Sequence, residues 1–145
     1  AGMTAVDLGA APGGWTWQLV NRLMNVTAVD NGPMDRRLMD SGQVEHVQGD
    51  GYMYRPKRTV DWMVCDIVDK PARSSALAAK WIGQRYCREL IINFKLPMKQ
   101  RYQEVMQCLG HIQDALDEAG VRAEIGCKQL YTDREEVTCH IRALR

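Results

Sequence analysis

The sequence lacks any run of apolar residues close to the roughly 18 that a membrane-spanning helix requires. Its first residues also lack the basic, apolar and small-residue order of a secretory signal peptide. The composition is 46% hydrophobic and 26% charged, which excludes disordered, collagen-like and low-complexity classes. We therefore expect a soluble cytoplasmic protein, and its 145 residues suffice for about one domain with an ordinary core.

Closely spaced cysteine pairs are missing as well. The five cysteines stand 22, 21, 19 and 12 residues apart, without a CxxC pair. This spacing favours neither a disulfide framework nor a zinc site, so we expect buried thiols at Cys65, Cys87, Cys108, Cys127 and Cys139. The three histidines are equally scattered, and we expect no bound metal. A net charge of +1 neither requires nor excludes a nucleic-acid partner, since a basic surface can be local.

Short apolar runs alternate with longer stretches of helical periodicity, which predicts an α/β fold with a mostly parallel sheet and crossover helices. The predicted strands are residues 4–8, 26–30, 44–47, 61–66 and 90–95. Each is nearly continuously apolar, as expected of strands covered on both faces. Helices are predicted from the turn after the first strand to about residue 22, over 73–87 and over 100–119. The segments 121–125 and 137–144 lie too close for another helix between them, so we predict that they pair antiparallel at the end of the sheet.

The most informative segment is DLGAAPGGW, which runs from Asp7 to Trp15, follows the first predicted strand and opens a helix. Three glycines and a proline at such a junction let backbone amides approach a ligand closely. The plainer interpretation is an ordinary strand-to-helix connection, but such connections often contain only one glycine. The spacing is not the GxGxxG pattern of dinucleotide-binding folds.

Asp30 and Asp66 end two further predicted strands, and Asp50 follows a third. Ligands of open α/β sheets bind at the carboxyl ends of the strands, and a carboxylate placed like Asp30 can accept both hydroxyls of a ribose. Each aspartate taken alone is as well explained as a cap or turn residue. Their succession along one edge of the sheet makes a ligand site the stronger hypothesis.

The glycine turn is followed by the stretches AVDNGP, QGDGY, VCDIVDKP, INFKLPMK and YTDREEVTCHIR. In this order and spacing the sequence resembles the FtsJ-type S-adenosylmethionine-dependent ribose 2'-O-methyltransferases, over nearly the whole chain. It is most similar to bacterial members that methylate a cytidine of large-subunit (23S) ribosomal RNA. The resemblance implies a Rossmann-like class I methyltransferase fold, with helices on both faces of a seven-stranded, mostly parallel sheet of order 3-2-1-4-5-7-6 whose seventh strand is antiparallel.

The resemblance also implies S-adenosyl-L-methionine as the cofactor and ribosomal RNA as the partner, with no membrane or metal, and we expect a monomer. Asp30 would hold the ribose hydroxyls of the cofactor, Asp50 its adenine amino edge, and Asp66 would lie beside the methyl-bearing sulfonium. The turn that binds the methionine end would consist of Ala11, Pro12, Gly13, Gly14 and Trp15.

Lys95, Asp66 and Glu136 match three members of the catalytic Lys-Asp-Lys-Glu tetrad of this family. Glu135 is the alternative acid, but strand alternation places Glu136 on the polar face of its predicted strand and favours it. Lys95 also fits a plain surface lysine at a strand end. The first lysine of the tetrad precedes the glycine turn in the family, and here the earliest lysine is Lys57. We therefore expect residues 1–145 to be a methyltransferase catalytic domain and a fragment, without its upstream helix and any amino-terminal RNA-binding domain.

The missing lysine bears on the chemistry. An ordinary lysine is protonated at neutral pH, and two neighbouring carboxylates favour that form. We expect Lys95 to orient and polarise the sugar hydroxyl, and the chain alone to bind cofactor while turning over poorly or not at all. The alternative function is a module that binds cofactor or RNA without turnover. A nicotinamide-dependent oxidoreductase is disfavoured by the AAPGG turn, and an amino-group methyltransferase by the DIVD sequence, which lacks a Pro-Pro-aromatic clamp.

Overall fold

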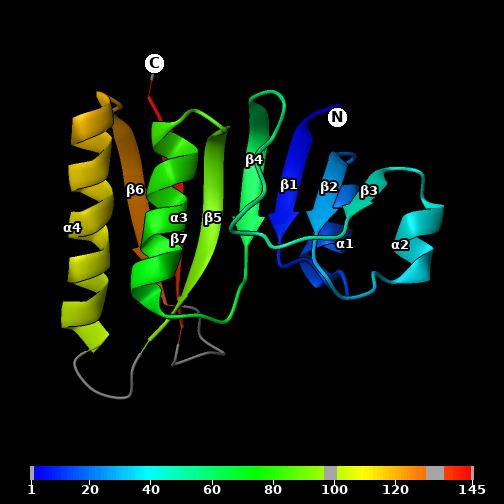
Figure 1. The fold of residues 1–145 in the computed structure, drawn as a ribbon, viewed down its shortest axis with the longest axis horizontal. Coiled ribbons are helices and arrows are strands. Elements are labelled where there is room, and N and C mark those ends of the chain that lie inside the picture. Colours follow the sequence, from blue (N-terminus) through cyan, green and yellow to red (C-terminus); the bar gives the residue numbers. More distant parts are fainter. Residues whose placement is uncertain (1, 97–100, 130–135, 145) are drawn as a thin grey trace.

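A single sheet organises the chain, of which the computed structural model describes residues 2–96, 101–129 and 136–144. Its strand order within these residues is β3-β2-β1-β4-β5-β7-β6, as Figure 1 shows. Neighbouring strands are parallel except β7, which is antiparallel to both β5 and β6. The strands are β1 (Thr4–Leu8), β2 (Asn25–Val29), β3 (Val44–Val47), β4 (Val60–Cys65), β5 (Cys87–Lys95), β6 (Ala123–Lys128) and β7 (Glu136–Ala143). The fold class and strand order implied by the resemblance are confirmed.

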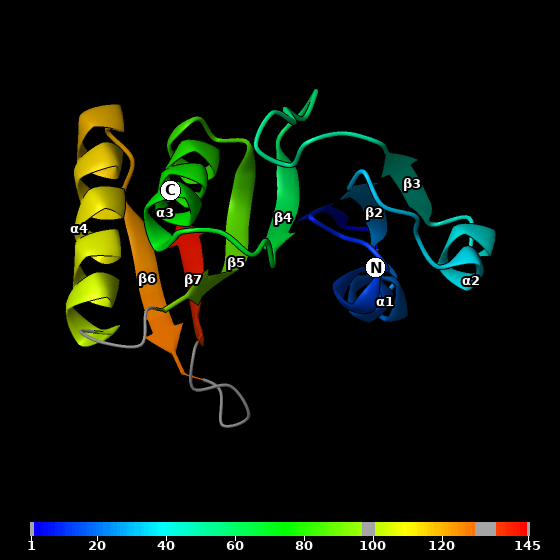
Figure 2. The same ribbon diagram turned by 60° about the horizontal axis from the view of Figure 1, so that its bottom comes forward.

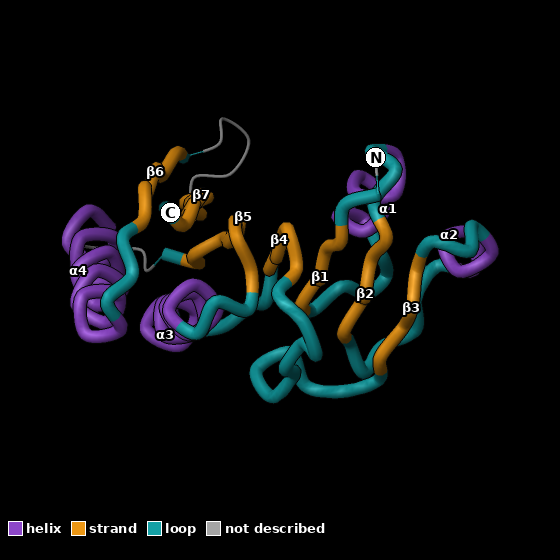
Figure 3. The backbone as a smooth tube through the Cα atoms, turned by 90° about the horizontal axis from the view of Figure 1, so that it is seen from above, coloured by secondary structure: helices purple, strands orange, loops and turns teal. Residues whose placement is uncertain are grey.

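Helices cover both faces of this sheet (Figures 2 and 3). The helices α1 (Gly14–Asn21) and α2 (Arg36–Asp40) lie on one face, beside β1, β2 and β3. The helices α3 (Pro71–Gly83) and α4 (Arg101–Ala119) lie on the other face, beside β4, β5, β7 and β6. This arrangement leaves the carboxyl ends of β1, β2, β3, β4 and β5 at one common edge, because these strands are parallel.

The larger core lies between α3, α4 and the strands β4, β5 and β7. Trp81 and Ile82 of α3 are fully buried there, as are Ile112 and Leu116 of α4, which stand one helical turn apart. Gly120, with φ of 70°, ends α4 in the left-handed conformation that glycine adopts without strain. A smaller core beneath α1 and α2 is centred on Leu19 and Leu38. Two layers of apolar side chains therefore hold the sheet.

The structure corrects several predicted element boundaries. The helix predicted over 73–87 ends at Gly83, because Arg85 adopts φ of 58° and turns the chain back toward the sheet. Cys87 then begins β5, three residues before the predicted strand, while Tyr86 packs its ring edge-on against Trp81 at 5.5 Å. The strand predicted over 121–125 lies at 123–128, and the five-residue helix α2 was not predicted. Residue 100, where α4 was predicted to begin, lies outside the described residues.

The cysteines divide into two groups. Cys65, Cys87 and Cys108 are buried free thiols, as the sequence predicts. The prediction was wrong for Cys127 and Cys139, which form a disulfide between β6 and β7. The register of the two strands places these residues directly opposite one another, which their spacing of 12 along the chain does not reveal. Within the described ranges no group of three or more potential ligands is arranged to hold a metal ion, and no helix is long and apolar enough to cross a membrane.

Candidate functional site

The glycine turn joins β1 to α1 and is tied to the end of β2. The backbone amides of Gly9 and Ala10 both donate hydrogen bonds to the carbonyl oxygen of Val29, at 2.8 and 3.2 Å. Gly13 caps α1 with φ of 134°, a conformation that side chains rarely adopt, and the Ala11–Pro12 peptide bond is cis. The first amides of α1 therefore face the carboxyl edge with no side-chain cap on them.

Asp30, directly after β2, links this turn to the following loop. Its Oδ2 accepts a hydrogen bond from the Ala11 amide at 2.9 Å, and its Oδ1 accepts one from the Gly32 amide at 2.8 Å. The ring of His46 on β3 lies 2.9 Å from the Asp30 carbonyl oxygen. The Asp30 carboxylate is therefore fixed in place by backbone donors on both sides.

The loops that follow β1, β3 and β4 also meet at this edge. Ile67, in the loop after β4, packs its side chain against Gly9 and Gly51. A Cβ atom added to Gly9 would stand 2.6 Å from Ile67 Cγ1, and one on Gly51 would stand 3.1 Å from Ile67 Cδ1. Gly9, with φ of 72°, is therefore required by the close approach of these loops, and Gly51 lets Ile67 pack tightly beside it. Asp50, next to Gly51, is carried to the same edge.

Asp50 itself is exposed and lies in a tight turn. Its Oδ1 accepts a hydrogen bond from the Tyr52 amide at 2.9 Å, the geometry of an aspartate that stabilises its own turn. The Tyr52 hydroxyl in turn donates to Asp69 at 2.9 Å, and Arg73 lies over the Tyr52 ring. The plain turn interpretation of Asp50 and its assignment to a ligand are thus compatible, because the carboxylate keeps further acceptor positions.

The three residues matched to the tetrad meet at the side chain of Lys95. Lys95 ends β5, and the register of the sheet places it directly opposite Glu136, the first residue of β7. Its Nζ lies 3.1 Å from Asp66 Oδ1 and also contacts Glu136 Oε1. The side chains of Lys95 and Glu136 are 24% and 16% exposed, so this ion pair is largely shielded from solvent. Glu135, the alternative acid, lies outside the described residues.

Two polar residues beneath this cluster were missed by sequence reasoning. The buried side chain of Asn93 donates from Nδ2 to Asp66 Oδ1 at 3.2 Å. The Thr138 hydroxyl donates to Asn93 Oδ1 at 2.6 Å. A polar residue at 93, within the otherwise apolar run 90–94, is a signal that the sequence does contain, because buried amides need hydrogen-bond partners.

Asp7 is a third residue that sequence reasoning did not single out. It is 2% exposed in β1, and its carboxylate accepts a hydrogen bond from the Thr16 hydroxyl at 2.7 Å. Burial raises the pKa of Asp7 to about 7, the negative charges of Asp66 and Asp30 add to this rise, and the Thr16 hydrogen bond opposes it. Burial also raises the pKa of the Cys65 thiol to about 12, so that this thiol is not a nucleophile at neutral pH.

The residues at this edge fit the cofactor that the resemblance implies. Each Asp30 oxygen accepts one hydrogen bond from a backbone amide, and a carboxylate has about four acceptor positions in all. Two positions therefore remain for two ribose hydroxyls. The uncapped amides at the start of α1 suit a carboxylate such as that of a methionine. Trp15 is half-buried and packs on the smaller core, so it anchors the turn to that core.

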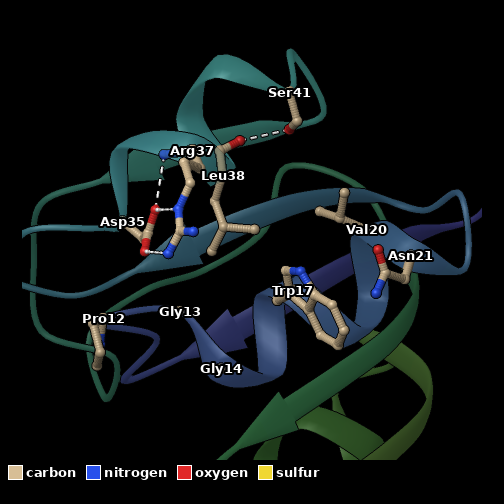
Figure 4. Close-up of a pocket in the computed structure, with 10 residues that line it drawn as sticks. All are labelled: Pro12, Gly13, Gly14, Trp17, Val20, Asn21, Asp35, Arg37, Leu38 and Ser41. Carbon is tan, nitrogen blue, oxygen red and sulfur yellow. Dashed lines mark hydrogen bonds and ion pairs between the residues drawn. The ribbon is translucent and has the colours of Figure 1, made fainter.

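A cavity of about 490 Å³ borders the glycine turn on its outer side, between α1 and α2 (Figure 4). The side chains of Trp17 and Leu38 face one another across it, and Arg37 forms an ion pair with Asp35 at its rim. Its lining includes Pro12, Gly13 and Gly14 but none of the three aspartates. This cavity is therefore distinct from the carboxyl edge where Asp30, Asp50 and Asp66 lie.

Comparison with known sequences identifies relatives along the whole chain. The model of the FtsJ-like methyltransferase family matches residues 1–91. A protein of Stutzerimonas stutzeri named ribosomal RNA large subunit methyltransferase M is 69% identical over 144 residues, which are 99% of this chain and 41% of that protein. A protein of the same name from Azotobacter vinelandii is 65% identical over 140 residues, which are 97% of this chain and 40% of that protein. The chain thus spans about two fifths of the length of these relatives.

Solved structures share the fold at low sequence identity. Trm5b of Pyrococcus abyssi has a TM-score of 0.70 at 15% identity, over 98% of this chain and 44% of that one. Fibrillarin of Aeropyrum pernix, solved with bound S-adenosyl-L-methionine, has a TM-score of 0.62 at 14% identity, over 97% of this chain and 66% of that one. At such identities the likeness establishes the fold alone.

Proposed function

The chain belongs to the FtsJ-like methyltransferase family, and from that premise we propose that residues 1–145 form a catalytic domain for 2'-O-methylation of ribosomal RNA. The acceptor is the ribose 2'-hydroxyl of a cytidine in the large-subunit (23S) RNA, and the methyl donor is S-adenosyl-L-methionine. The name of the 69% identical relative supports an RNA of the large ribosomal subunit. The site residues support transfer to a hydroxyl.

The observation that carries this proposal is the placement of Lys95 between two carboxylates. A protonated lysine has three hydrogen-bond donors. Asp66 and Glu136 accept two of them, which leaves one donor for the oxygen of an incoming hydroxyl. The two carboxylates also hold the ammonium group in one position, which is what an in-line displacement requires of a group that orients its nucleophile. Lys95 therefore acts as an orienting and polarising group.

The cofactor supplies an electrophilic methyl group on a sulfonium, and this chain binds and orients it. The turn from Ala11 to Gly14 would hold its methionine end, Asp30 would accept from its ribose hydroxyls, and Asp50 would accept from its adenine amino group. Asp66 would lie beside the sulfonium, and its Oδ1 contacts Lys95 Nζ. The transfer would form a carbon–oxygen bond to the 2'-oxygen and break the carbon–sulfur bond of the sulfonium. Its products would be the methylated ribose, S-adenosylhomocysteine and the hydroxyl proton, which passes to water.

A ribosomal RNA substrate would support a cytoplasmic location, where bacterial ribosomes are assembled. We propose that it acts there as a monomer. None of the assigned roles calls for a metal ion.

The test is methyl transfer by this chain in the context of a longer relative. The matching segment of the Stutzerimonas stutzeri protein is replaced by residues 1–145, and tritium from labelled cofactor is followed into unmodified 23S RNA, with nucleoside mapping of the product. We expect 2'-O-methylcytidine. The Lys95→Ala variant is expected to lose about 100-fold in rate, with cofactor affinity measured by calorimetry changed less than about threefold.

Lys80→Ala is the matched control, since Lys80 lies on α3 and its Nζ contacts only the Tyr52 carbonyl among the described residues. Label on a base instead of a ribose would overturn the 2'-O assignment. Cofactor binding without any transfer, in both the chain and the chimera, would favour the module that binds without turnover. Full activity of Lys95→Ala would remove the proposed role of the lysine.

A further inference from the structure

Beneath Lys95 and Asp66 lies a second polar layer, and its position suggests a role in the same reaction. Asn93 stands two residues before Lys95, so both side chains lie on one face of β5. Asn93 is only 5% exposed. A buried amide in the middle of a sheet destabilises the fold unless both of its ends are hydrogen-bonded, so its retention here calls for a partner.

Both ends of the Asn93 amide are hydrogen-bonded, and chemistry fixes which way it points. The Asp66 carboxylate can only accept hydrogen bonds, so the Asn93 nitrogen must face Asp66 and its oxygen must face Thr138. The Thr138 hydroxyl must then donate its proton to that oxygen. The hydrogen bonds from Thr138 to Asn93 and from Asn93 to the Asp66 carboxylate therefore run in one direction only.

The sheet register builds this network from two residue pairs of β5 and β7. Asn93 is paired with Thr138, two positions along the register from the pair of Lys95 and Glu136, so the two pairs are neighbours on one face of the sheet. Asp66 bridges the pairs, because its Oδ1 accepts from both Asn93 Nδ2 and Lys95 Nζ, at 3.2 and 3.1 Å. One oxygen atom of Asp66 thus receives a donor from each pair.

This support matters because Asp66 is poorly held by its own surroundings. It follows the end of β4, and its side chain is 40% exposed. A side chain at the start of a loop has several rotamers, and each would place the carboxylate differently with respect to Lys95. The amide of Asn93 comes from the interior of the neighbouring strand, so it provides the fixed point that the loop does not.

We propose that Asn93 and Thr138 are positioning residues that fix the Asp66 carboxylate, and through it the Lys95 ammonium, for methyl transfer. This inference rests on the proposed function. Neither residue touches substrate or cofactor: Thr138 orients the Asn93 amide, and Asn93 holds Asp66 Oδ1. Loss of either changes the geometry of the ion-pair cluster and leaves the cofactor-binding turn intact.

The kinetic test uses conservative variants of the half-buried Thr138 in the chimera described above. Thr138→Val keeps the shape of the side chain and removes the hydroxyl, whereas Thr138→Ser keeps the hydroxyl. We expect Thr138→Val to lower kcat about tenfold, the loss of one buried hydrogen bond, with KM for cofactor changed less than about twofold. Thr138→Ser should restore kcat to within about threefold of the parent.

Asn93→Leu removes both hydrogen bonds at similar volume and is expected to lower kcat by more than Thr138→Val does. The matched control is Glu89→Gln, on the same face of β5 but six residues before Lys95, where Glu89 contacts His140 instead of the cluster. Its kcat should stay within about twofold of the parent. If Asn93→Leu does not fold, which thermal unfolding reveals, Thr138→Val and Thr138→Ser decide the matter.

A second readout needs no activity and separates this inference from the proposed function. The carboxyl carbon resonance of Asp66 is followed by NMR in the 145-residue chain. We expect it to move in Thr138→Val and to stay in place in Thr138→Ser and Glu89→Gln. An unmoved resonance together with unchanged kcat in Thr138→Val would overturn the positioning role. Absence of methyl transfer by the parent chimera would instead overturn the proposed function, and the resonance alone would then decide whether Thr138 and Asn93 position Asp66.

Discussion

Asp7 is more deeply buried than the carboxylates of Asp30, Asp50 and Asp66 at the carboxyl edge. It is 2% exposed, whereas Asp30 is half-buried and Asp50 is exposed. Removal from water disfavours its charged form, and the single hydrogen bond from Thr16 does not offset this, so the pKa of Asp7 rises to about 7. Near neutral pH the residue is therefore divided between its neutral and charged forms.

The raised pKa of Asp7 predicts a stability change with pH. Between about pH 4 and pH 7 the folded state keeps a proton that the unfolded chain has lost, so the free energy of unfolding falls as pH rises through this window and levels off above it. Asp7→Asn removes the titration and keeps an acceptor for Thr16. We expect the free energy of unfolding of the variant to rise relative to that of the parent by up to about 4 kcal/mol between pH 4 and pH 8. Urea unfolding at several pH values measures this, and parallel curves for the two proteins would contradict it.

The partner of Lys95 on β7 gives a second prediction at this scale. Glu136→Gln keeps the size of the side chain and removes the charge that the Lys95 ammonium contacts. We expect about a tenfold or larger loss of methyl transfer, with cofactor affinity retained. Glu135→Gln provides the comparison, since Glu135 is the alternative acid that the sequence offers. Equal losses in the two variants, measured by tritium transfer in the chimera, would show that the choice of Glu136 is wrong.

At the scale of elements, the turn between β1 and α1 depends on the conformation of one glycine. A side chain at Gly13 would meet a φ of 134°, and its Cβ would overlap Leu38 of α2. Gly110, by contrast, lies on the exposed face of α4 with no atom near its would-be Cβ. The backbone therefore requires glycine at position 13, whereas position 110 can accept a side chain.

Alanine at these two positions should change stability in opposite directions. Gly13→Ala is expected to destabilise the fold by at least about 1–2 kcal/mol, through backbone strain and the contact with Leu38. Gly110→Ala is expected to stabilise it by about 0.5–1 kcal/mol, since alanine favours the helix. Chemical unfolding of both variants measures the difference. A neutral Gly13→Ala would show that the turn adapts and that its glycine is not required for folding.

At the scale of the whole molecule, the site exists only where separate loops converge on one edge. The turn after β1, the loop after β2 and the loop after β4 are joined by the contacts of Asp30 with Ala11 and of Ile67 with Gly9. A ligand that spans these loops binds the folded state alone, and it therefore raises the free energy of unfolding of the whole domain.

Ligand protection tests this convergence without any turnover. At 100 times its dissociation constant, S-adenosylhomocysteine should stabilise the chain by about 2.7 kcal/mol, while NAD should leave the unfolding transition in place. Asp30→Ala should reduce the protection, because it removes the acceptor that we propose for the ribose hydroxyls. Protection by NAD and none by S-adenosylhomocysteine would overturn the assignment of the cofactor site.

Local pattern was enough to predict much of this fold. β1 and β3 have the predicted bounds, and the alternation of apolar runs with helices correctly indicated a parallel sheet. Such signals are local, because a buried parallel strand is a short apolar run wherever it lies in the sheet. The end of α3 was predicted too late, since the helical spacing of Tyr86 continues past the point where Arg85 turns the chain. Periodicity records which side chains are buried and does not record the backbone angle that ends a helix.

The sequence alone offers the candidate groups of the site: a glycine turn, a lysine and several carboxylates, at or just after the ends of strands. How these groups meet depends on the tertiary structure. The pairing of β7 with β5 sets Glu136 against Lys95 and Thr138 against Asn93. The pairing of β7 with β6 sets Cys127 against Cys139. Lys95 and Glu136 are 41 positions apart in the chain, and the register of two distant strands depends on the packing of the whole sheet. The raised pKa of Asp7 has the same origin, because desolvation depends on everything that surrounds the carboxyl group.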